Sequence, residues 1–173
     1  MLWDKGIGEF IDACKIIKGK NINARFVLVG ESDPDNPAAI DSKQLDTWQS
    51  SCFVDWLGRQ EEISSIFALS HIVCLPSYRE GLPKVLLEAA ACGRPIVTTN
   101  TPGCREIVRH GENGLLVPVK DSKALAQALE CLIFDAELRK KMGARGREIA
   151  VQEFSVEKVV RETLAIYKEL LGP

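Results

Sequence analysis

Residues 75–95 read L-P-S-Y-R-E-G-L-P-K-V-L-L-E-A-A-A-C-G-R-P, and the rest of the chain is organised around them. The short apolar run 71–75 predicts a buried strand that ends at the proline after it. After a polar loop, Gly81-Leu82-Pro83 predicts a helix start, because proline is favoured at the first helical position. The free N–H groups of that first turn, together with the helix dipole, form a site for an anion such as a phosphate.

Two carboxylates frame this predicted helix start. Glu80 lies in the loop, and Glu88 follows it after seven residues, inside the predicted helix 83–92. At about 1.5 Å per residue, Glu88 lies roughly 7 Å along the axis from the helix start. Glu80 and Glu88 can therefore address two different parts of one bound ligand, while Gly81 lets that ligand approach the backbone closely.

Short apolar runs alternate with amphipathic runs along the whole chain. This alternation predicts a parallel sheet with helices on both faces, a doubly wound α/β fold. Ligands of such sheets bind beyond the carboxyl ends of the strands. The loop 76–84, Gly30-Glu31 and Gly58-Arg59 each follow a predicted strand, so we expect them to converge on one site. The predicted strands are 24–29, 53–57, 71–75, 95–99 and 115–117, and the predicted helices are 9–18, 38–50, 60–69, 83–92, 104–109, 123–134, an exposed basic helix 136–153, and 156–171.

Length and composition narrow the class of protein. The chain has 173 residues, enough for one domain with a full core. Its formal net charge is −2, without the basic stripe of a nucleic-acid-binding domain. Six cysteines without Cys-x-x-Cys spacing favour buried free thiols in a reducing compartment, and two histidines apart from any cysteine cluster argue against a metal site. No apolar run is as long as a membrane span, so we expect a cytoplasmic location.

The string P-S-Y-R-E-G-L-P-K-V-L-L-E-A-A-A-C-G-R-P-I-V resembles the signature of retaining nucleotide-sugar glycosyltransferases of the GT-B fold, glycosyltransferase family 4 or glycosyl transferases group 1. The resemblance runs essentially end to end but covers only the C-terminal half of such an enzyme. It implies that residues 1–173 form a single donor-binding domain, a three-layer Rossmann-like sheet whose first strand is truncated. The N-terminal acceptor domain is absent, and the helix 155–171 is similar to the element that crosses to it.

The resemblance also assigns roles position by position. Lys5, in the opening M-L-W-D-K-G, matches the lysine that holds the donor pyrophosphate, and the matching arginine would precede Met1. Glu80 would contact the hydroxyls of the donor sugar, and Glu88 would accept hydrogen bonds from the ribose hydroxyls. The other donor-binding candidates are Gly81, Leu82 and Pro83 at the helix start, Lys84 after it, for which a solvated surface lysine is an equal alternative, and Arg59 in the Gly58-Arg59 loop.

The chemistry that the resemblance implies is mainly electrostatic. A departing nucleoside diphosphate carries negative charge, which Lys5 and the helix-start N–H groups would stabilise. We therefore take Lys5 and Glu80 as catalytic candidates, and we expect no cofactor and no metal. The implied reaction moves a hexose or N-acetylhexosamine from a nucleoside-diphosphate sugar to a glycan or lipid-linked acceptor. The opening L-W-D-K-G-I-G-E-F favours a UDP-sugar as the donor.

Two other functions stay open at this point. The first is a nucleotide-sugar epimerase of GT-B type, and the second is an isolated nucleotide-binding module without catalysis. We expect the 173-residue chain to be inactive in transfer by itself, because the acceptor half is missing. The partners expected for the full-length protein are the nucleotide-sugar, the acceptor and the inner face of the plasma membrane by peripheral association, but no nucleic acid.

Overall fold

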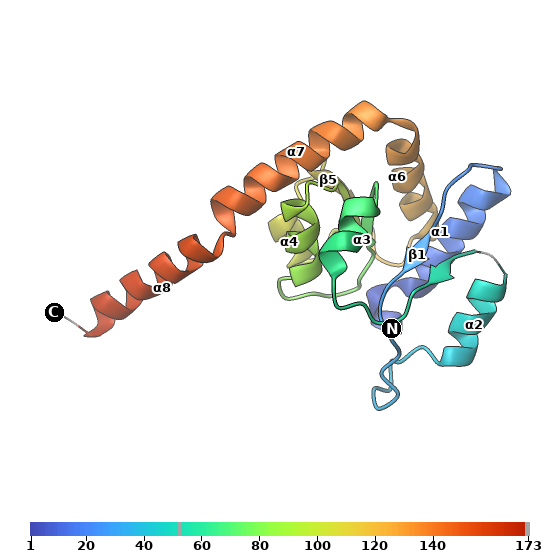
Figure 1. The fold of residues 1–173 in the computed structure, drawn as a ribbon, viewed down its shortest axis with the longest axis horizontal. Helices are drawn as coiled ribbons and strands as arrows, with labels where there is room; N and C mark the ends of the chain where they lie inside the picture. Colours follow the sequence, from blue (N-terminus) through green and yellow to red (C-terminus); the bar gives the residue numbers. More distant parts are fainter. Residues whose placement is uncertain (52, 172–173) are drawn as a thin grey trace.

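The computed structural model describes residues 1–51 and 53–171 as an α/β fold (Figure 1). Strands and helices alternate in the predicted order, and every described strand pair is parallel. The strands are β1 (Val27–Leu28), β2 (Asp55–Trp56), β3 (Val73–Leu75), β4 (Ile96–Thr99) and β5 (Gly114–Val117). The helices are η1, a 3-10 turn (Trp3–Lys5), α1 (Ile7–Gly19), α2 (Ser42–Ser50), α3 (Ile63–Leu69), α4 (Lys84–Ala91), α5 (Cys104–Ile107), α6 (Ser122–Phe134), α7 (Ala136–Glu153) and α8 (Val156–Leu171).

The strands form two parallel sheets, ordered β1-β2 and β3-β4-β5. In the larger sheet Ile96 of β4 lies opposite Val73 of β3 and Gly114 of β5. Most strands are shorter than the apolar runs predicted: the run 24–29 contributes only Val27 and Leu28 to β1. Strand length depends on the neighbouring strand that supplies hydrogen-bond partners, and this neighbour is not encoded in the run itself.

Helices cover both faces of the β3-β4-β5 sheet, and β4 shows this directly. Neighbouring side chains of a strand point to opposite faces. Val97 packs into a core cluster with the buried faces of α1 and α6, whereas Ile96 packs into a second cluster with α3, α4 and α5. In Figure 1, α1 and α6 lie together on one side and α3 and α4 on the other. The predicted doubly wound, three-layer fold is confirmed.

Helix α7 differs from the exposed basic helix that the sequence predicted. Its residues Met142, Gly143, Gly146, Ile149 and Ala150 are buried, and the helix packs against α4. Gly143 makes this possible, because a Cβ there would overlap the backbone of the turn that follows α4. Small residues let two backbones approach closely, and a hydrophobic periodicity alone does not reveal such a contact.

Helix α8 extends away from the rest of the molecule (Figure 1). None of its residues is buried, although Val160, Leu164 and Tyr167 are large apolar residues. The predicted amphipathic helix is confirmed, and its apolar face is exposed. Within the described residues, no helix is both long and apolar enough to cross a lipid bilayer.

The described cysteines are free thiols, as predicted. Cys14 and Cys104 are buried, and burial raises the pKa of the Cys74 thiol to about 12. Cys131 is exposed, contrary to the expectation of burial, because it lies on the outer face of α6. Cys52 lies outside the described residues. The reducing compartment stays a prediction.

Candidate donor-binding site

The turn that carries Lys5 is pressed against the loop that carries Glu80. Lys5 ends the 3-10 turn η1, and Gly6 follows in the left-handed conformation with φ 70° before α1 begins. A Cβ at Gly6 would overlap the carbonyl oxygen of Pro76, the first residue after β3. Both the left-handed backbone and the close approach require glycine at this position. Lys5 is therefore held at the carboxyl end of β3.

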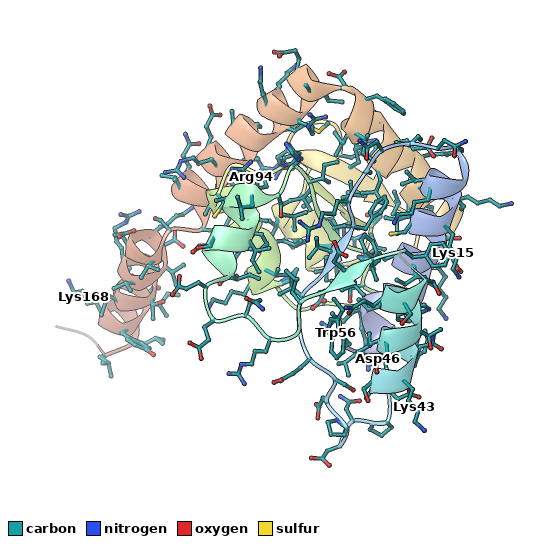
Figure 2. The ribbon with its side chains drawn as sticks, turned by 45° about the vertical axis from the view of Figure 1, so that its right-hand side comes forward. Lys15, Lys43, Asp46, Trp56, Arg94 and Lys168 are labelled. Atoms are coloured by element: carbon teal, nitrogen blue, oxygen red, sulfur yellow. The ribbon has the colours of Figure 1, made fainter. Side chains whose placement is uncertain are left out.

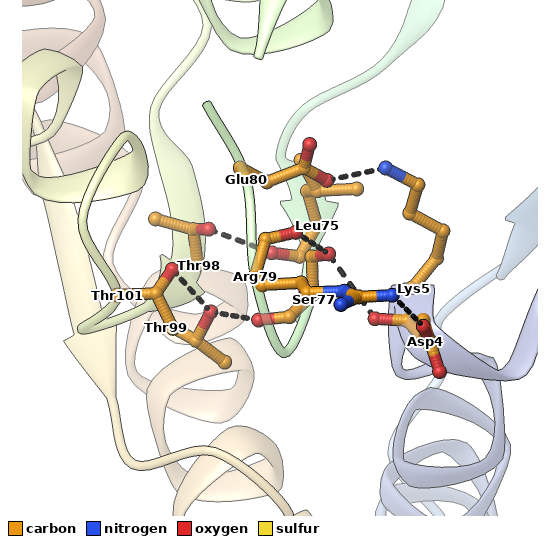
Figure 3. Close-up of polar contacts among 9 residues, drawn as sticks. All are labelled: Asp4, Lys5, Leu75, Ser77, Arg79, Glu80, Thr98, Thr99 and Thr101. Atoms are coloured by element: carbon orange, nitrogen blue, oxygen red, sulfur yellow. Dashed lines mark hydrogen bonds and ion pairs between the residues drawn. The ribbon is translucent and has the colours of Figure 1, made fainter. Parts of the chain in front are cut away.

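Hydrogen bonds join the same two segments (Figure 3). The carbonyl of Asp4 accepts from the backbone N–H of Tyr78 at 2.9 Å and from the Ser77 hydroxyl at 3.2 Å. The Asp4 carboxylate pairs with Arg79 at 3.2 Å on the exposed side. These contacts bridge parts of the chain more than seventy residues apart, and they fix the start of the Glu80 loop on the Lys5 turn.

Lys5 and Glu80, predicted separately as phosphate and sugar contacts, meet in an ion pair. Lys5 Nζ donates to Glu80 Oε1 at 2.7 Å (Figure 3). The Glu80 side chain is 12% exposed and that of Lys5 is 39% exposed. The structure thus places one cation and one carboxylate in contact at the carboxyl end of the sheet.

Three threonines, at the end of β4 and just after it, form hydrogen bonds beside the Glu80 loop. The sequence pattern did not single them out. Thr98 Oγ1 donates to the Leu75 carbonyl at 2.6 Å. Thr99 Oγ1 donates to the Ser77 carbonyl and also lies 3.5 Å from the hydroxyl of Thr101 (Figure 3). Thr98, Thr99 and Ser77 are nearly inaccessible to solvent. Hydroxyl residues at the end of the apolar run 95–99 were the available signal, because buried hydroxyls need hydrogen-bond partners.

Gly103, immediately before α5, packs against the Glu80 loop. It has φ 55°, and a Cβ there would overlap the backbone carbonyls of Glu80 and Gly81. The space beside Gly81 itself is open: nothing lies within 4 Å of a Cβ built there. Gly103 is thus the glycine that packing demands, while Gly81 leaves room next to the helix start.

Helix α4 begins one residue later than predicted. Lys84 is its first residue, and Pro83 occupies the N-cap position with extended backbone angles instead of the first helical position. Proline has no side-chain acceptor, and no side chain caps the helix. The first N–H groups of α4 are therefore left without the side-chain acceptor that an N-cap serine or aspartate would supply.

The side chains around this helix start include both charged and apolar groups. Leu82 is exposed. Lys84, also exposed, lies 3.5 Å from Glu88, one turn further along α4. Lys84 is thus a surface lysine with an acidic neighbour. Its phosphate contact stays a prediction.

Tyr78 links the loop to two further elements. Its hydroxyl donates to Glu9 Oε1 on α1 at 2.7 Å, and the ammonium of Lys120, after β5, lies 5.0 Å from the ring centre. Burial, followed by the hydrogen bond to Glu9, raises the pKa of Tyr78 to about 12. Lys120 has φ 59°, which is uncommon for a residue with a side chain. Tyr78 therefore links the Glu80 loop to helix α1 and to the segment that follows β5.

Arg59 lies in a second pair of loops. The backbone N–H of Gly30 donates to the Gly58 carbonyl at 2.7 Å. Trp56, labelled in Figure 2, donates from its indole nitrogen to the Gly30 carbonyl at 2.7 Å. Arg59 is exposed and pairs with Glu31 at 3.4 Å. Two of the three loops predicted to converge, Gly30-Glu31 and Gly58-Arg59, thus contact each other. The loop 76–84 contacts the Lys5 turn instead, and the convergence of all three loops on one site stays a prediction.

A shallow groove connects Glu88 with the segment that follows Arg59. It has a volume of about 240 Å³ and lies between α3 and α4. Its lining includes Glu61, Glu62 and Phe67 on one side and Glu88 and Cys92 on the other. Among the described residues, no group of three or more histidine, cysteine, aspartate or glutamate side chains is arranged to hold a metal ion.

Comparison with known proteins gives a consistent picture. The family model described as "Glycosyl transferases group 1" matches residues 1–149. The chain is 32% identical over 170 residues to N,N'-diacetylbacillosaminyl-diphospho-undecaprenol alpha-1,3-N-acetylgalactosaminyltransferase of Campylobacter jejuni, covering 98% of the chain and 43% of that protein. The chain therefore spans less than half the length of this curated relative.

Solved structures agree with the fold. Anabaena Alr3699/HepE in complex with UDP and glucose has a TM-score of 0.81 and 26% identity, over 95% of this chain and 46% of that one. The C-terminal domain of a glycosyl transferase group 1 family protein (LpcC) from Francisella tularensis has a TM-score of 0.78 and 26% identity, over 90% of this chain and 83% of that one.

Proposed function

The chain belongs to glycosyl transferases group 1, and from this premise we propose that it is the donor-binding half of a retaining glycosyltransferase. The observation that carries the proposal is the assembly around Glu80. The ion pair of Lys5 with Glu80 joins the η1 turn to the loop that leads into α4, and Glu88 lies one turn inside that helix. A cation, open backbone N–H groups and two carboxylates are the groups that a diphosphate, a sugar and a ribose require.

Each group has one task in this proposal. Lys5 and the first N–H groups of α4 bind the diphosphate and stabilise its charge as it leaves. Glu80 orients the hydroxyls of the donor sugar, and Glu88 accepts hydrogen bonds from the ribose. Lys84 adds positive charge near the phosphates, while Leu82 and Pro83 shape the approach to the helix start. We propose that no metal or other cofactor takes part.

Arg59 is proposed to contact the base or the diphosphate. It follows β2, and the groove that begins two residues later reaches Glu88. A nucleoside whose ribose lies at Glu88 can extend toward this side of α4. In this proposal Arg59 belongs to the donor site, although its partner in the structure is Glu31.

We propose that the donor is a UDP-sugar and that the acceptor is a glycan or a lipid-linked sugar. The Anabaena neighbour was solved with UDP and glucose, and the name of the Campylobacter relative specifies a diphospho-undecaprenol acceptor and N-acetylgalactosamine transfer. We further propose that the acceptor is bound by a separate N-terminal domain, that the reaction takes place in the cytoplasm or at the inner face of the plasma membrane, and that the chain alone does not transfer sugar.

Calorimetric titration of the chain with UDP, GDP and ADP tests the proposal. We expect UDP to bind best, and we then expect UDP-glucose and UDP-N-acetylgalactosamine to show which sugar is preferred. Binding of none of these nucleotides at millimolar concentration would contradict a donor site in this chain. Sugar transfer by the chain alone would contradict the need for a separate acceptor domain.

A further inference from the structure

The Glu80 carboxylate and the diphosphate of a bound nucleotide compete for the same cation, Lys5. This inference rests on the proposed function. A carboxylate accepts hydrogen bonds but donates none, whereas an ammonium group only donates. In the structure Lys5 Nζ already donates to Glu80 at 2.7 Å. A diphosphate that approaches Lys5 therefore meets a cation whose charge is largely balanced by a neighbouring carboxylate.

The two members of the pair differ in how firmly they are held. Glu80 lies in a loop that is hydrogen-bonded to Asp4 through Ser77 and Tyr78 and that is packed against Gly103. Its side chain is 12% exposed, against 39% for Lys5, which has a long flexible stem. When a third charged group enters, Lys5 is the member that can turn toward it, and Glu80 stays in place.

We propose that Glu80 makes the site discriminate between an intact nucleotide-sugar and a free nucleoside diphosphate. A free diphosphate must draw Lys5 away from Glu80 and leaves the carboxylate without its cation. An intact donor compensates, because the sugar hydroxyls donate hydrogen bonds to the same carboxylate. Glu80 thus weakens the binding of the leaving product more than that of the substrate, and it promotes release of the nucleoside diphosphate after transfer.

Glu80→Gln tests this discrimination, because it keeps the shape of the side chain and removes its charge. Calorimetry would measure binding of UDP, inorganic pyrophosphate and UDP-glucose to the chain and to the variant. We expect UDP and pyrophosphate to bind roughly threefold to fivefold more tightly to the variant, the scale of a charge interaction near a protein surface. We expect the preference for UDP-glucose over UDP to fall by at least the same factor. Unchanged or weaker binding of UDP would overturn the proposal.

A matched control exists in the same molecule. Lys20 Nζ donates to Glu130 at 2.7 Å, and the Glu130 side chain is 17% exposed, close to the value for Glu80. Glu130→Gln removes the same charge from an equivalent pair at the far end of α1. We expect it to leave all three affinities unchanged; an equal gain in this control would attribute the effect to net charge and overturn the proposal.

The Lys5→Met variant distinguishes competition for Lys5 from simple electrostatic repulsion between Glu80 and the phosphates. In Lys5→Met, we expect Glu80→Gln to give no further gain in UDP affinity, because no cation is left to release. A gain that persists there would overturn the competition. The failure of the proposed function looks different: the unmodified chain then binds neither UDP nor pyrophosphate. If the unmodified chain binds both and only the Glu80→Gln gain is missing, the donor site stands and the discrimination falls.

Discussion

Helix α1 has a Lys–Glu ion pair at each end, and the shortest distance between lysine nitrogen and carboxylate oxygen is the same in both, although Lys20 contacts both oxygens of its partner. Lys5–Glu80 lies just before the helix and Lys20–Glu130 just after it, both at 2.7 Å with well-covered carboxylates. Their surroundings differ. Glu80 lies in a strand-end loop next to the start of α4, whereas Glu130 lies on α6, a helix that packs along α1. The pair itself therefore does not mark a site; the segments that it joins do.

The backbone at the two ends of α1 differs in the same way. At Gly6 a side chain would collide with Pro76, while at Gly19 nothing lies within 4 Å of a Cβ. The first end is constrained because two loops from distant parts of the sequence must meet there. The second end only terminates a helix. Substitutions at the two ends should therefore give unequal effects, and the experiments below test whether they do.

Substitution of the two glycines should give the largest difference. We expect Gly6→Ala to destabilise the fold by about 3–5 kcal/mol, because it combines a steric overlap with a left-handed backbone. Gly19→Ala should stabilise by up to about 1 kcal/mol, because alanine is the better helix former. Urea unfolding followed by circular dichroism measures both. Equal effects would remove the distinction between the two ends.

Loss of a site carboxylate should affect binding without affecting the fold. We expect Glu88→Ala to weaken UDP binding by about 1–3 kcal/mol, the range for a hydrogen bond with a charged partner. Calorimetry measures the affinity, and thermal unfolding should show an intact fold. Glu130→Ala is the matched control and should leave UDP affinity unchanged. If Glu88→Ala also leaves it unchanged, Glu88 does not belong to the site.

Tyr78→Phe tests the link between the Glu80 loop and α1. The change removes the hydroxyl that donates to Glu9, whose other oxygen is buried without a hydrogen-bond partner among the described residues. We expect a loss of about 1–1.5 kcal/mol in unfolding free energy at neutral pH.

The pH dependence of the same variant gives a second check. The folded protein keeps the Tyr78 proton up to a pKa of about 12, whereas an unfolded tyrosine loses it near pH 10. The folded state therefore binds more protons in this interval, and Tyr78 makes stability fall as pH rises from about 10 to 12. In the phenylalanine variant this part of the decline should disappear. An identical pH profile would show that the folded state does not raise the pKa of Tyr78.

The smallest effect is expected at the far end of α1. Lys20→Met removes an ion pair whose lysine is half exposed, and such pairs contribute about 0.2–1 kcal/mol. We expect a loss within this range and no change in UDP affinity, measured by unfolding and calorimetry. A loss of UDP affinity would mean that this end of α1 is also energetically coupled to the donor site.

The sequence predicted the helices better than the strands, for a physical reason. Helical periodicity is local, so the helix predicted at 136–153 matches α7 residue for residue. The strand predicted at 24–29 shrinks to Val27–Leu28, because a strand extends only as far as its neighbour pairs with it. That same helix was predicted to be exposed and is half buried, because its glycines pack on α4 through contacts remote in sequence.

The site shows the same division. Glu80 and Glu88 could be found because their spacing and setting lie within one short stretch. The residues that support that stretch could not be found from the sequence. Thr99 contacts Ser77, 22 residues away, and Gly103 packs against the backbone of Gly81, a contact that leaves no side-chain pattern in the sequence. Family membership and the doubly wound fold are confirmed, whereas the roles of Lys5 and Glu80 in donor binding stay predictions until UDP binding is measured.

Strand β4 contributes side chains to both hydrophobic core clusters, and this affects the cooperativity of unfolding. Val97 belongs to the cluster that anchors α1, which follows Lys5, and Ile96 belongs to the cluster that anchors α4, which carries Glu88. If either cluster unfolds, one face of β4 loses its packing against the neighbouring helices. The two halves of the site should therefore appear and disappear in a single transition, so that nucleotide binding reports on the integrity of the whole fold and not on one half of it.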